Sequence, residues 1–313
     1  MSVKVFIDGS SGTTGLRIAD RLAQRPEIEL LSISAEGRKD VNERAKVINS
    51  ADLAFLCLPD AASKEVMPLL RPDVKVLDTS TAFRTDAAWD YGFPELKGQK
   101  AKIQNSYRVA VPGCYASGFI SIARPLVELG LAPADYPFSC TGISGYSGGG
   151  KKMIAEYESA DRPVHSKLDA PKSYGLGLAH KHLPEMQKIS GLAHTPMFVP
   201  VVCDYYCGMQ VLVPLDLTLA GSTAEQVAEG IAAYYKDAAT VKVHALNEAL
   251  PENGLYSNAM AGTDRMELYM TVNAAGDQMM LVSLFDNLGK GSSGAAVQCM
   301  NLMLGLEETE GLE

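Results

Sequence analysis

Cys114 lies in the stretch VPGCYASG, residues 111–118, between a Pro-Gly turn and an apolar run with helical spacing. The run FISIARPLVELGLA predicts a helix that begins close to the cysteine. The N-terminus of a helix lowers the pKa of a thiol, and its free N–H groups can hold an oxyanion. We therefore interpret Cys114 as a nucleophile, with a small buried residue at a turn as the alternative.

Two histidines and a glutamate, His180, His182 and Glu185, follow in the stretch GLAHKHLPEMQ. Pro184 fits the first turn of a helix, so we expect the histidines to precede that helix and Glu185 to enter it. Two histidines at this spacing share a pocket only if the backbone between them is extended. Because Glu185 is close enough to orient its ring, we assign His182 as the acid–base group and His180 as a substrate-binding residue. A plain surface segment is the alternative.

A glycine-rich segment, DGSSGTTG, follows the apolar run VKVFI and precedes a helical pattern. Its spacing, G-x-x-G-x-x-G, is one residue off the commoner dinucleotide fingerprint but meets the same needs: a tight turn, close backbone approach to a pyrophosphate, and N–H groups at a helix start. A plain glycine turn is the alternative. We predict a cofactor-binding loop made of Gly9, Ser11, Gly12, Thr13 and Gly15.

Ser34, Arg38 and Lys39 follow the second predicted strand, IELLSIS. A hydroxyl followed by basic residues suits a ribose 2′-phosphate better than a free 2′-hydroxyl. These residues therefore favour NADP over NAD, although a solvated surface loop has the same composition.

Arg84 follows a strand end and a hydroxyl cluster in LDTSTAFRTD. A guanidinium beside hydroxyl groups can cradle a phosphate or a carboxylate. We assign Arg84 and Ser80 to substrate binding, with an ordinary ion-paired arginine as the alternative.

The elements that must position these residues change in type along the chain. Over the first hundred residues, buried apolar strands alternate with short helices, which predicts a parallel sheet with helices on both faces. From about residue 135, longer alternating strands are linked by turns and predict an antiparallel sheet. A last apolar helix follows the Gly-rich turn DNLGKGSSG.

The predicted fold class is α/β, with a Rossmann-type dinucleotide-binding domain and an inserted α+β domain whose sheet is mainly antiparallel. We expect residues 1–113 and 290–313 to form the dinucleotide-binding domain, and residues 114–289 to form the catalytic and oligomerisation domain.

Composition excludes several classes of protein. The chain has 313 residues, 47% hydrophobic and 21% charged, with a net charge of −9, which argues against general affinity for nucleic acid. No apolar run is long enough for a membrane span, and the first residues read as a strand rather than as a signal peptide. Six scattered cysteines without a C-x-x-C pair indicate free thiols in a cytoplasmic protein.

Cys203 and Cys207 are the one cysteine pair whose spacing hints at a shared ligand. In a continuous strand both would face the same side, which is weak evidence for a metal. We predict no metal site.

Together these segments resemble the N-acetyl-γ-glutamyl-phosphate reductase family along nearly the whole chain. VPGCYASGFISIARP is similar to its active-site signature, GSSGTTG to its nucleotide loop, HKHLPEMQ to its histidine block, and DNLGKGSSGAAVQCMNLMLGL to its C-terminal signature. The length and the GTTGL opening are similar to the compact branch of the family. Ser117 stands where threonine is usual, and Met197 where longer members tend to carry histidine.

The resemblance implies an NADPH-dependent reductive dephosphorylation of an acyl phosphate in arginine biosynthesis, through a thioester on Cys114. It also implies a homodimer or tetramer. In the C-terminal segment we assign Asn287 and Gly291 to cofactor binding, and we assign Ser144 and Gly145 to substrate binding. Two alternatives remain: another acyl-phosphate reductase, such as an aspartate-semialdehyde dehydrogenase or a relative from lysine biosynthesis, and a non-catalytic NADP-binding redox sensor.

Overall fold

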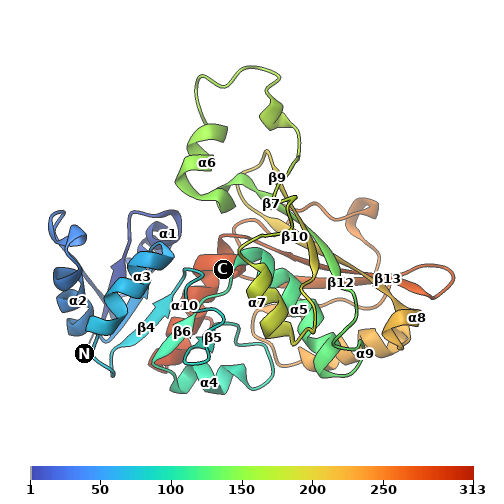
Figure 1. Ribbon diagram of the computed structural model, residues 1–313, viewed down its shortest axis with the longest axis horizontal. Coiled ribbons are helices and arrows are strands. Elements are labelled where there is room, and N and C mark those ends of the chain that lie inside the picture. The colour runs from blue at the N-terminus through green and yellow to red at the C-terminus, as the bar shows by residue number, and fades with distance from the viewer. Residues whose placement is uncertain (1) are drawn as a thin grey trace. The chain divides into compact units, whose positions relative to one another are not determined.

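The computed structural model describes residues 2–313, which separate into two compact units (Figure 1). Unit 1 comprises the chain up to Gly113 together with Ser292–Leu312. Unit 2 comprises Cys114–Gly291 and Glu313. The C-terminal helix α10 (Gly294–Leu304) is therefore part of unit 1, although the whole of unit 2 precedes it in the sequence.

Unit 1 is built on a parallel sheet of six strands. Their order is β2 (Ile28–Leu31), β1 (Val3–Asp8), β3 (Leu53–Leu56), β4 (Lys75–Asp78), β6 (Arg108–Ala110) and β5 (Asp90–Tyr91). Every pairing in this sheet is parallel. Parallel neighbours require crossover connections, and the chain supplies them mostly as helices. The predicted α/β fold with a parallel sheet is confirmed.

Helices cover both faces of this sheet, because successive apolar side chains along a strand point to opposite faces and both sets are buried. Val5 and Ile7 of β1 pack with α1 (Thr13–Leu22), α4 (Gln99–Asn105) and α10, whereas Phe6 packs on the opposite face. That opposite face is covered by α2 (Val41–Ser50) and α3 (Asp60–Val66). The single tryptophan, Trp89, lies at the margin of this second cluster, and its ring stacks on Phe83 at 4.3 Å between centroids.

Unit 2 is built on a sheet of seven strands. Their order is β11 (Val241–Val243), β12 (Met266–Val272), β13 (Gln278–Phe285), β10 (Met209–Asp216), β7 (Ser139–Gly145), β9 (Met197–Cys203) and β8 (Lys172–Ser173). The pairs β12–β13, β13–β10, β10–β7 and β9–β8 are antiparallel, but β11–β12 and β7–β9 are parallel. The sheet is therefore mixed, because β9 runs parallel to β7 and β11 runs parallel to β12.

The helix α5 (Cys114–Glu128) lies across one face of this sheet and packs on β10 and β13. Gly118 permits the close approach, because a Cβ there would lie 2.6 Å from Val211 and 2.7 Å from the Ser283 hydroxyl. The helices α7 (Leu183–Ser190) and α9 (Ala224–Tyr234) pack beside α5, and α8 (Leu217–Ala220) follows β10.

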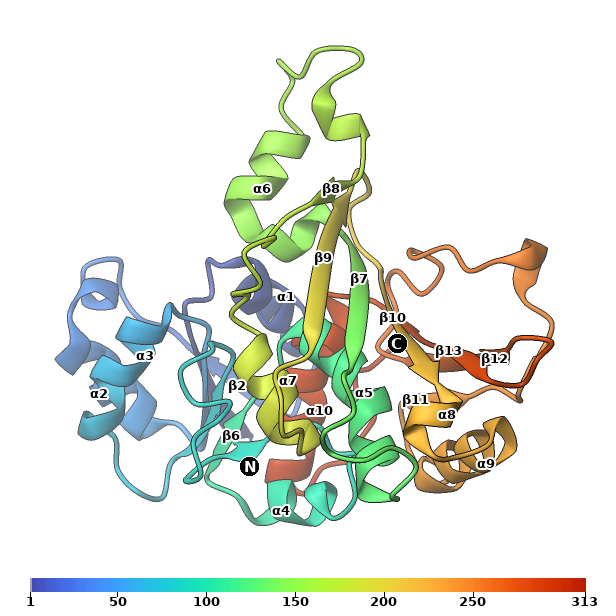
Figure 2. The ribbon, with the colours of Figure 1, turned by 45° about the vertical axis from the view of Figure 1, so that its right-hand side comes forward.

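Between β7 and β9 the chain leaves the sheet in an excursion over residues 146–171, which ends at the edge strand β8. It contains a 3-10 turn (Tyr146–Gly149), α6 (Gly150–Tyr157) and a second 3-10 turn (Lys167–Asp169). Figure 2 shows this excursion rising beyond the ends of β7 and β9 within unit 2. Tyr157 and Leu168 of the excursion form a small core with Val202 of β9, and Tyr146, Met153 and Tyr174 pack against them.

Two local expectations are corrected by the structure. The Gly-rich segment expected as a turn before the last helix is a π-helical turn, Gly289–Ser293, continuous with α10. Cys203 ends β9, and Cys207 lies in the turn after it, so the two cysteines do not share a strand face. Among the described helices, none combines the length and apolar character that a bilayer crossing requires.

Candidate active site

Cys114 is the first residue of the 15-residue helix α5 and is partly exposed. The predicted start of this helix is confirmed, and the thiol stands where the first N–H groups of α5 lack partners within the helix. The π-helical turn contacts Cys114 through Gly291. A Cβ at Gly291 would lie 2.9 Å from Cys114 Cβ and 3.1 Å from the Asp286 carbonyl oxygen. A glycine at position 291 therefore lets the chain pass directly against the cysteine.

The two histidines lie together at the start of α7. Their ring centroids are 4.7 Å apart with nearly perpendicular planes. The sequence predicted an extended backbone between them, and this prediction is wrong. The backbone forms a turn in which the Leu183 N–H donates to the His180 carbonyl at 3.0 Å. A turn brings both rings to one side because it folds the chain back on itself. Pro184 lies in the first turn of α7, as predicted.

His182 and Glu185 are both buried, with 5% and 2% of their surface exposed. His182 is the residue before α7, and Glu185 is in its first turn. A carboxylate in the first turn of a helix is favoured by the helix dipole. The helix α7 packs against α5, and Arg124 of α5 donates to the Ile189 carbonyl at 2.9 Å. The packing of these two helices therefore fixes the histidine pair relative to the helix that begins with Cys114.

His180 has an unusual protonation environment. Burial and the neighbouring Lys181 charge lower the pKa of His180 to about 4. Its Nδ1 accepts a hydrogen bond from the His182 backbone N–H at 3.2 Å. At neutral pH the ring is therefore neutral, and Nε2 carries its proton.

Tyr115, which the sequence pattern alone did not indicate as a site residue, lies at the centre of this group. Its ring contacts His180, His182 and Phe198. Its hydroxyl lies 3.1 Å from the Val201 carbonyl and 3.4 Å from the Tyr174 hydroxyl. Burial raises the pKa of Tyr115 well above its ordinary value. Its place directly after Cys114 at the helix start was the signal that could have found it.

Gly145, at the end of β7, begins the loop assigned to substrate. Its N–H donates to the Gly208 carbonyl at 3.0 Å, and a Cβ there would lie 2.6 Å from the Tyr205 and Tyr206 carbonyl oxygens. Ser144 is buried, and its hydroxyl donates to the Gly145 carbonyl at 3.0 Å. Position 145 therefore requires glycine, because the backbone of the turn 204–208 leaves no room for a side chain.

Both polar atoms of the Asn287 side chain form hydrogen bonds within unit 2. Its Oδ1 accepts from the Gly208 N–H at 2.9 Å, and its Nδ2 donates to the Ser147 hydroxyl at 3.0 Å. Its side chain therefore supports the substrate loop, and its assignment to cofactor remains a prediction.

In unit 1, the glycine loop forms the predicted turn between β1 and α1. Gly9 has φ +87°, and a Cβ there would lie 2.3 Å from the Cys57 carbonyl oxygen. A Cβ at Gly15 would lie 2.4 Å from the Gly9 carbonyl oxygen. Gly12 is the residue before α1, and its N–H donates to the Gly9 carbonyl at 2.9 Å. Two of the three glycines are therefore required by backbone packing alone.

A cavity of about 310 Å³ opens beside this loop and is lined by Gly9, Ser11, Leu31, Arg38 and Leu58 among others. Thr13 Oγ1, at the first position of α1, is buried without a hydrogen-bond partner among residues 2–313. A glycine loop at a helix N-terminus, an unpartnered hydroxyl and an arginine among the cavity-lining residues fit a dinucleotide.

The residues assigned to the 2′-phosphate lie on one exposed segment after β2. Arg38 lines the cavity, and Lys39 follows it in the same 3-10 turn, Gly37–Lys39. The Ser34 hydroxyl accepts the Gly37 N–H at 3.0 Å and so holds the start of this turn. The structure thus brings Arg38 to the cavity and gives Ser34 a local structural contact.

Arg84 and Ser80 are both buried in unit 1, close to Asp78. Arg84 donates to the Val111 and Thr79 carbonyl oxygens, each at 2.9 Å. The Ser80 hydroxyl donates to Asp78 Oδ2 at 2.6 Å. Burial raises the pKa of Asp78, and Ser80 and Arg84 oppose this shift. Their assignment to substrate remains a prediction.

No cluster of three or more histidine, cysteine, aspartate or glutamate side chains suited to a metal ion occurs within residues 2–313. The candidate sites are the glycine loop with its cavity in unit 1, and Cys114 with the histidine pair and Glu185 in unit 2.

Comparison with known proteins identifies the families to which the two units are similar. The family profile "Semialdehyde dehydrogenase, NAD binding domain" matches residues 4–104, and "Semialdehyde dehydrogenase, dimerisation domain" matches residues 114–287. The curated N-acetyl-γ-glutamyl-phosphate reductase of Trichormus variabilis is 46% identical over 99% of both chains. The chain belongs to the N-acetyl-γ-glutamyl-phosphate reductase family.

Other reductases of this family show the same degree of similarity. The one from Burkholderia cenocepacia is 46% identical over 96% of this chain and 97% of its own, and the one from Allorhizobium ampelinum is 46% identical over 97% and 99%.

Solved structures of aspartate-semialdehyde dehydrogenases share the fold of this chain. The Vibrio cholerae enzyme II matches with a TM-score of 0.71 and 18% identity over 97% of this chain and 99% of its own. The Candida albicans enzyme, solved with NADP, matches with a TM-score of 0.65 and 14% identity over 97% and 99%.

Proposed function

We propose that this chain catalyses the reduction of N-acetyl-γ-glutamyl phosphate to N-acetylglutamate semialdehyde and phosphate, with NADPH as the reductant, in arginine biosynthesis. Relatives with this name at 44–47% identity over nearly the full length support the substrate. The observation that carries the chemistry is the thiol of Cys114 at the start of α5, in the unit that also holds the histidine pair and Glu185.

In the first half-reaction, the Cys114 thiolate attacks the acyl carbon. A C–S bond forms, the C–O bond to phosphate breaks, and phosphate leaves with the electron pair. The N-terminal N–H groups of α5 stabilise both the thiolate and the oxyanion of the tetrahedral species. Arg84 and Ser80 are proposed to bind the departing phosphate.

In the second half-reaction, the thioester carbon becomes an aldehyde carbon. When bound at the glycine loop, the dinucleotide supplies a hydride to this carbon. His182, oriented by Glu185, donates a proton to the developing alkoxide and so yields a thiohemiacetal on Cys114. The same histidine then removes the hydroxyl proton as the C–S bond breaks, which releases the aldehyde and restores the thiolate. His180, with its proton on Nε2, donates a hydrogen bond to the substrate.

The glycine loop, Thr13 and the cavity wall at Arg38 are proposed to hold the cofactor, and the positive charges of Arg38 and Lys39 favour NADP over NAD. We also propose a homo-oligomer, which the dimerisation-domain match supports. A cytoplasmic location is supported by the six cysteines, all of which are free thiols in the described chain.

The reverse reaction gives a direct test. Purified protein is mixed with N-acetylglutamate semialdehyde, NADP and phosphate, and NADPH formation is followed by absorbance. We expect phosphate-dependent NADPH formation, at least about 100-fold faster than with aspartate semialdehyde.

A higher rate with aspartate semialdehyde would instead identify an aspartate-semialdehyde dehydrogenase. Absence of turnover with every aldehyde, together with intact NADP binding, would favour the redox-sensor alternative.

A further inference from the structure

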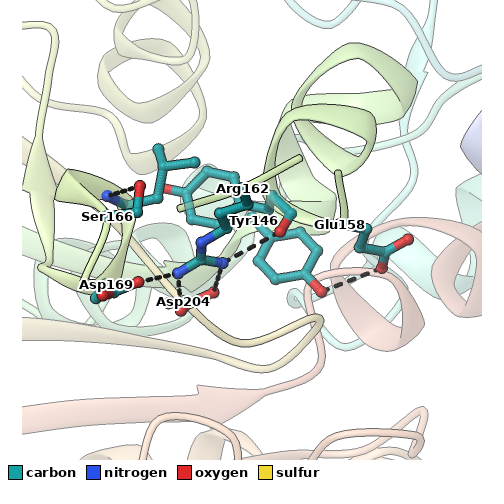
Figure 3. Close-up of polar contacts among 8 residues, drawn as sticks. Tyr146, Glu158, Arg162, Ser166, Asp169 and Asp204 are labelled. Atoms are coloured by element: carbon teal, nitrogen blue, oxygen red, sulfur yellow. Dashed lines mark hydrogen bonds and ion pairs between the residues drawn. The ribbon is translucent and has the colours of Figure 1, made fainter. Parts of the chain in front are cut away.

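Arg162 connects several parts of the excursion between β7 and β9 (Figure 3). Its guanidinium binds both carboxylate oxygens of Asp204, at 2.9 and 2.5 Å, and also pairs with Asp169. It donates to the Tyr157 carbonyl at 3.1 Å, and its charge lies 5.8 Å from the centre of the Tyr157 ring. A planar guanidinium with bidentate geometry holds a carboxylate in one orientation, which a lysine cannot do.

Asp204 begins the turn that holds the substrate loop in place. The next two residues, Tyr205 and Tyr206, accept hydrogen bonds from the N–H groups of Tyr146 and Ser147, at 2.9 and 3.0 Å. At the other end of this turn, the Gly208 carbonyl accepts the Gly145 N–H. The backbone from Gly145 to Ser147 is therefore bonded to the turn 204–208, whose first residue is held by Arg162.

A second connection runs through the aromatic side chains. Tyr157 stacks on Tyr146, with 4.7 Å between centroids and planes 17° apart. The Tyr146 hydroxyl donates to Glu158 at 3.1 Å, so the end of α6 is tied to the first residue of the loop that follows β7 (Figure 3). Because Arg162 contacts both Tyr157 and Asp204, it acts on the loop from two sides.

Arg162 is more deeply placed than an ordinary surface arginine. Its side chain is 18% exposed, against 47% for Asp169. The hydrogen bonds with Arg162 lower the pKa of Asp204. By contrast, the contact with Asp169 is a single one on the exposed side of the cluster. The Asp204 contact is thus the one that transmits position to the loop.

We propose that Arg162 is a positioning residue for the substrate loop, which it holds in its binding geometry through Asp204 and Tyr157. The inference rests on the proposed function, because that function assigns Ser144 and Gly145 to substrate. Arg162 itself touches none of the residues assigned to catalysis in any hydrogen bond, ion pair or ring contact described above. Its loss should therefore affect substrate affinity and the order of the loop more than the chemistry on Cys114.

The test compares Arg162→Met with three other variants. We expect Arg162→Met to raise KM for N-acetylglutamate semialdehyde about 10-fold or more while kcat falls less, since small misplacements of binding groups weaken productive binding. Arg162→Lys should restore little, and the exchange Arg162→Asp with Asp204→Arg should restore part of the affinity. Asp169→Asn should resemble the wild type.

A structural readout accompanies the kinetics. Amide hydrogen exchange at Tyr146 and Ser147 should speed up in Arg162→Met but not in Asp169→Asn. As a matched control, Arg71→Met removes an Arg–Asp pair in unit 1, at 2.8 Å, and should leave KM and this exchange unchanged. If Arg162→Met is too unstable to purify, Asp204→Asn carries the same expectations.

Unchanged KM and unchanged exchange in folded Arg162→Met would overturn the proposal. A loss of thermal stability without a KM change would also overturn it, because that is the mark of a merely structural arginine. If the wild type turns over no aldehyde, the proposed function fails, while the exchange measurement still decides whether Arg162 orders the loop.

Discussion

The nucleotide cradle of unit 1 and the thiol group of unit 2 are built in different ways. The cradle is made of backbone: Gly9 and Gly15 are excluded from carrying a side chain by carbonyl oxygens closer than 2.5 Å to their Cβ positions. The candidate site around Cys114 is instead made of side chains from α5 and from the start of α7, and these two helices pack against each other. A backbone site is damaged by added atoms, whereas a side-chain site is damaged by removed functional groups.

The largest expected effect is on the thiol. Cys114→Ser should lower turnover by roughly 10³-fold or more, because a serine hydroxyl has no accessible anion at neutral pH. NADP affinity, measured by calorimetry, should stay within about twofold, since the cradle belongs to unit 1. Residual activity of even a tenth of the wild type would remove Cys114 as the nucleophile.

Substitution of the two histidines should affect different kinetic constants. His182→Asn is expected to lower kcat by roughly 10²–10⁴-fold, the usual loss for a general acid–base group. His180→Asn should act mainly on KM, because its neutral ring only donates a hydrogen bond. Steady-state kinetics of both variants at saturating NADP separate these roles. A large kcat loss in His180→Asn with a near-normal His182→Asn would reverse the assignment.

Removal of both charges at the cavity should change cofactor choice. The double variant Arg38→Ala with Lys39→Ala is expected to weaken NADP binding by roughly 10- to 100-fold, the scale of one or two charge-assisted hydrogen bonds. NAD affinity should hardly change, because NAD lacks the 2′-phosphate. Equal losses for both nucleotides in titration calorimetry would refute the phosphate-reading role.

Within the cradle, two glycines give a matched pair. Gly15→Ala should lower the stability of unit 1 by about 1–3 kcal/mol, because its Cβ would overlap the Gly9 backbone. Gly12→Ala should be tolerated by the free enzyme, since the nearest atom to its Cβ lies at 3.4 Å. Thermal unfolding of the two variants without nucleotide checks this; similar melting temperatures would contradict it.

The last expected effect concerns pH and is confined to acidic conditions. The pKa of His180 is lowered to about 4 in the fold, so between pH 6.5 and 4 the unfolded chain binds a proton that the folded chain does not. Stability should therefore fall as the pH is lowered through this window. Urea unfolding at several pH values should show a shallower fall for His180→Asn than for the wild type. An identical pH dependence in the two proteins would exclude this contribution.

The sequence predicted the parts of the molecule that local rules determine. The parallel sheet of unit 1 followed from apolar strands alternating with helices, and the start of α5 from the Pro-Gly turn before Cys114. Pro184 in the first turn of α7 was found for the same reason, since proline lacks the N–H that a helix interior requires.

What the sequence did not give depended on distant partners. The parallel pairing of β9 with β7 depends on the long excursion between them, and no local pattern sets its direction. Side-chain alternation predicted an extended backbone between the two histidines, yet a turn also brings the rings together. Arg162 and Asp204, 42 residues apart, had no local feature to link them.

The stacked Trp89–Phe83 pair makes the protein an unusually simple optical system. Trp89 is the single tryptophan of the chain and packs at the margin of the α2–α3 core of unit 1. Red-edge excitation therefore observes unit 1 alone, while the thirteen tyrosines report on both units. Energy transfer from this indole to a reduced nicotinamide would give a binding signal without any label. Separate melting of the tryptophan and tyrosine signals would reveal whether the two units unfold as one.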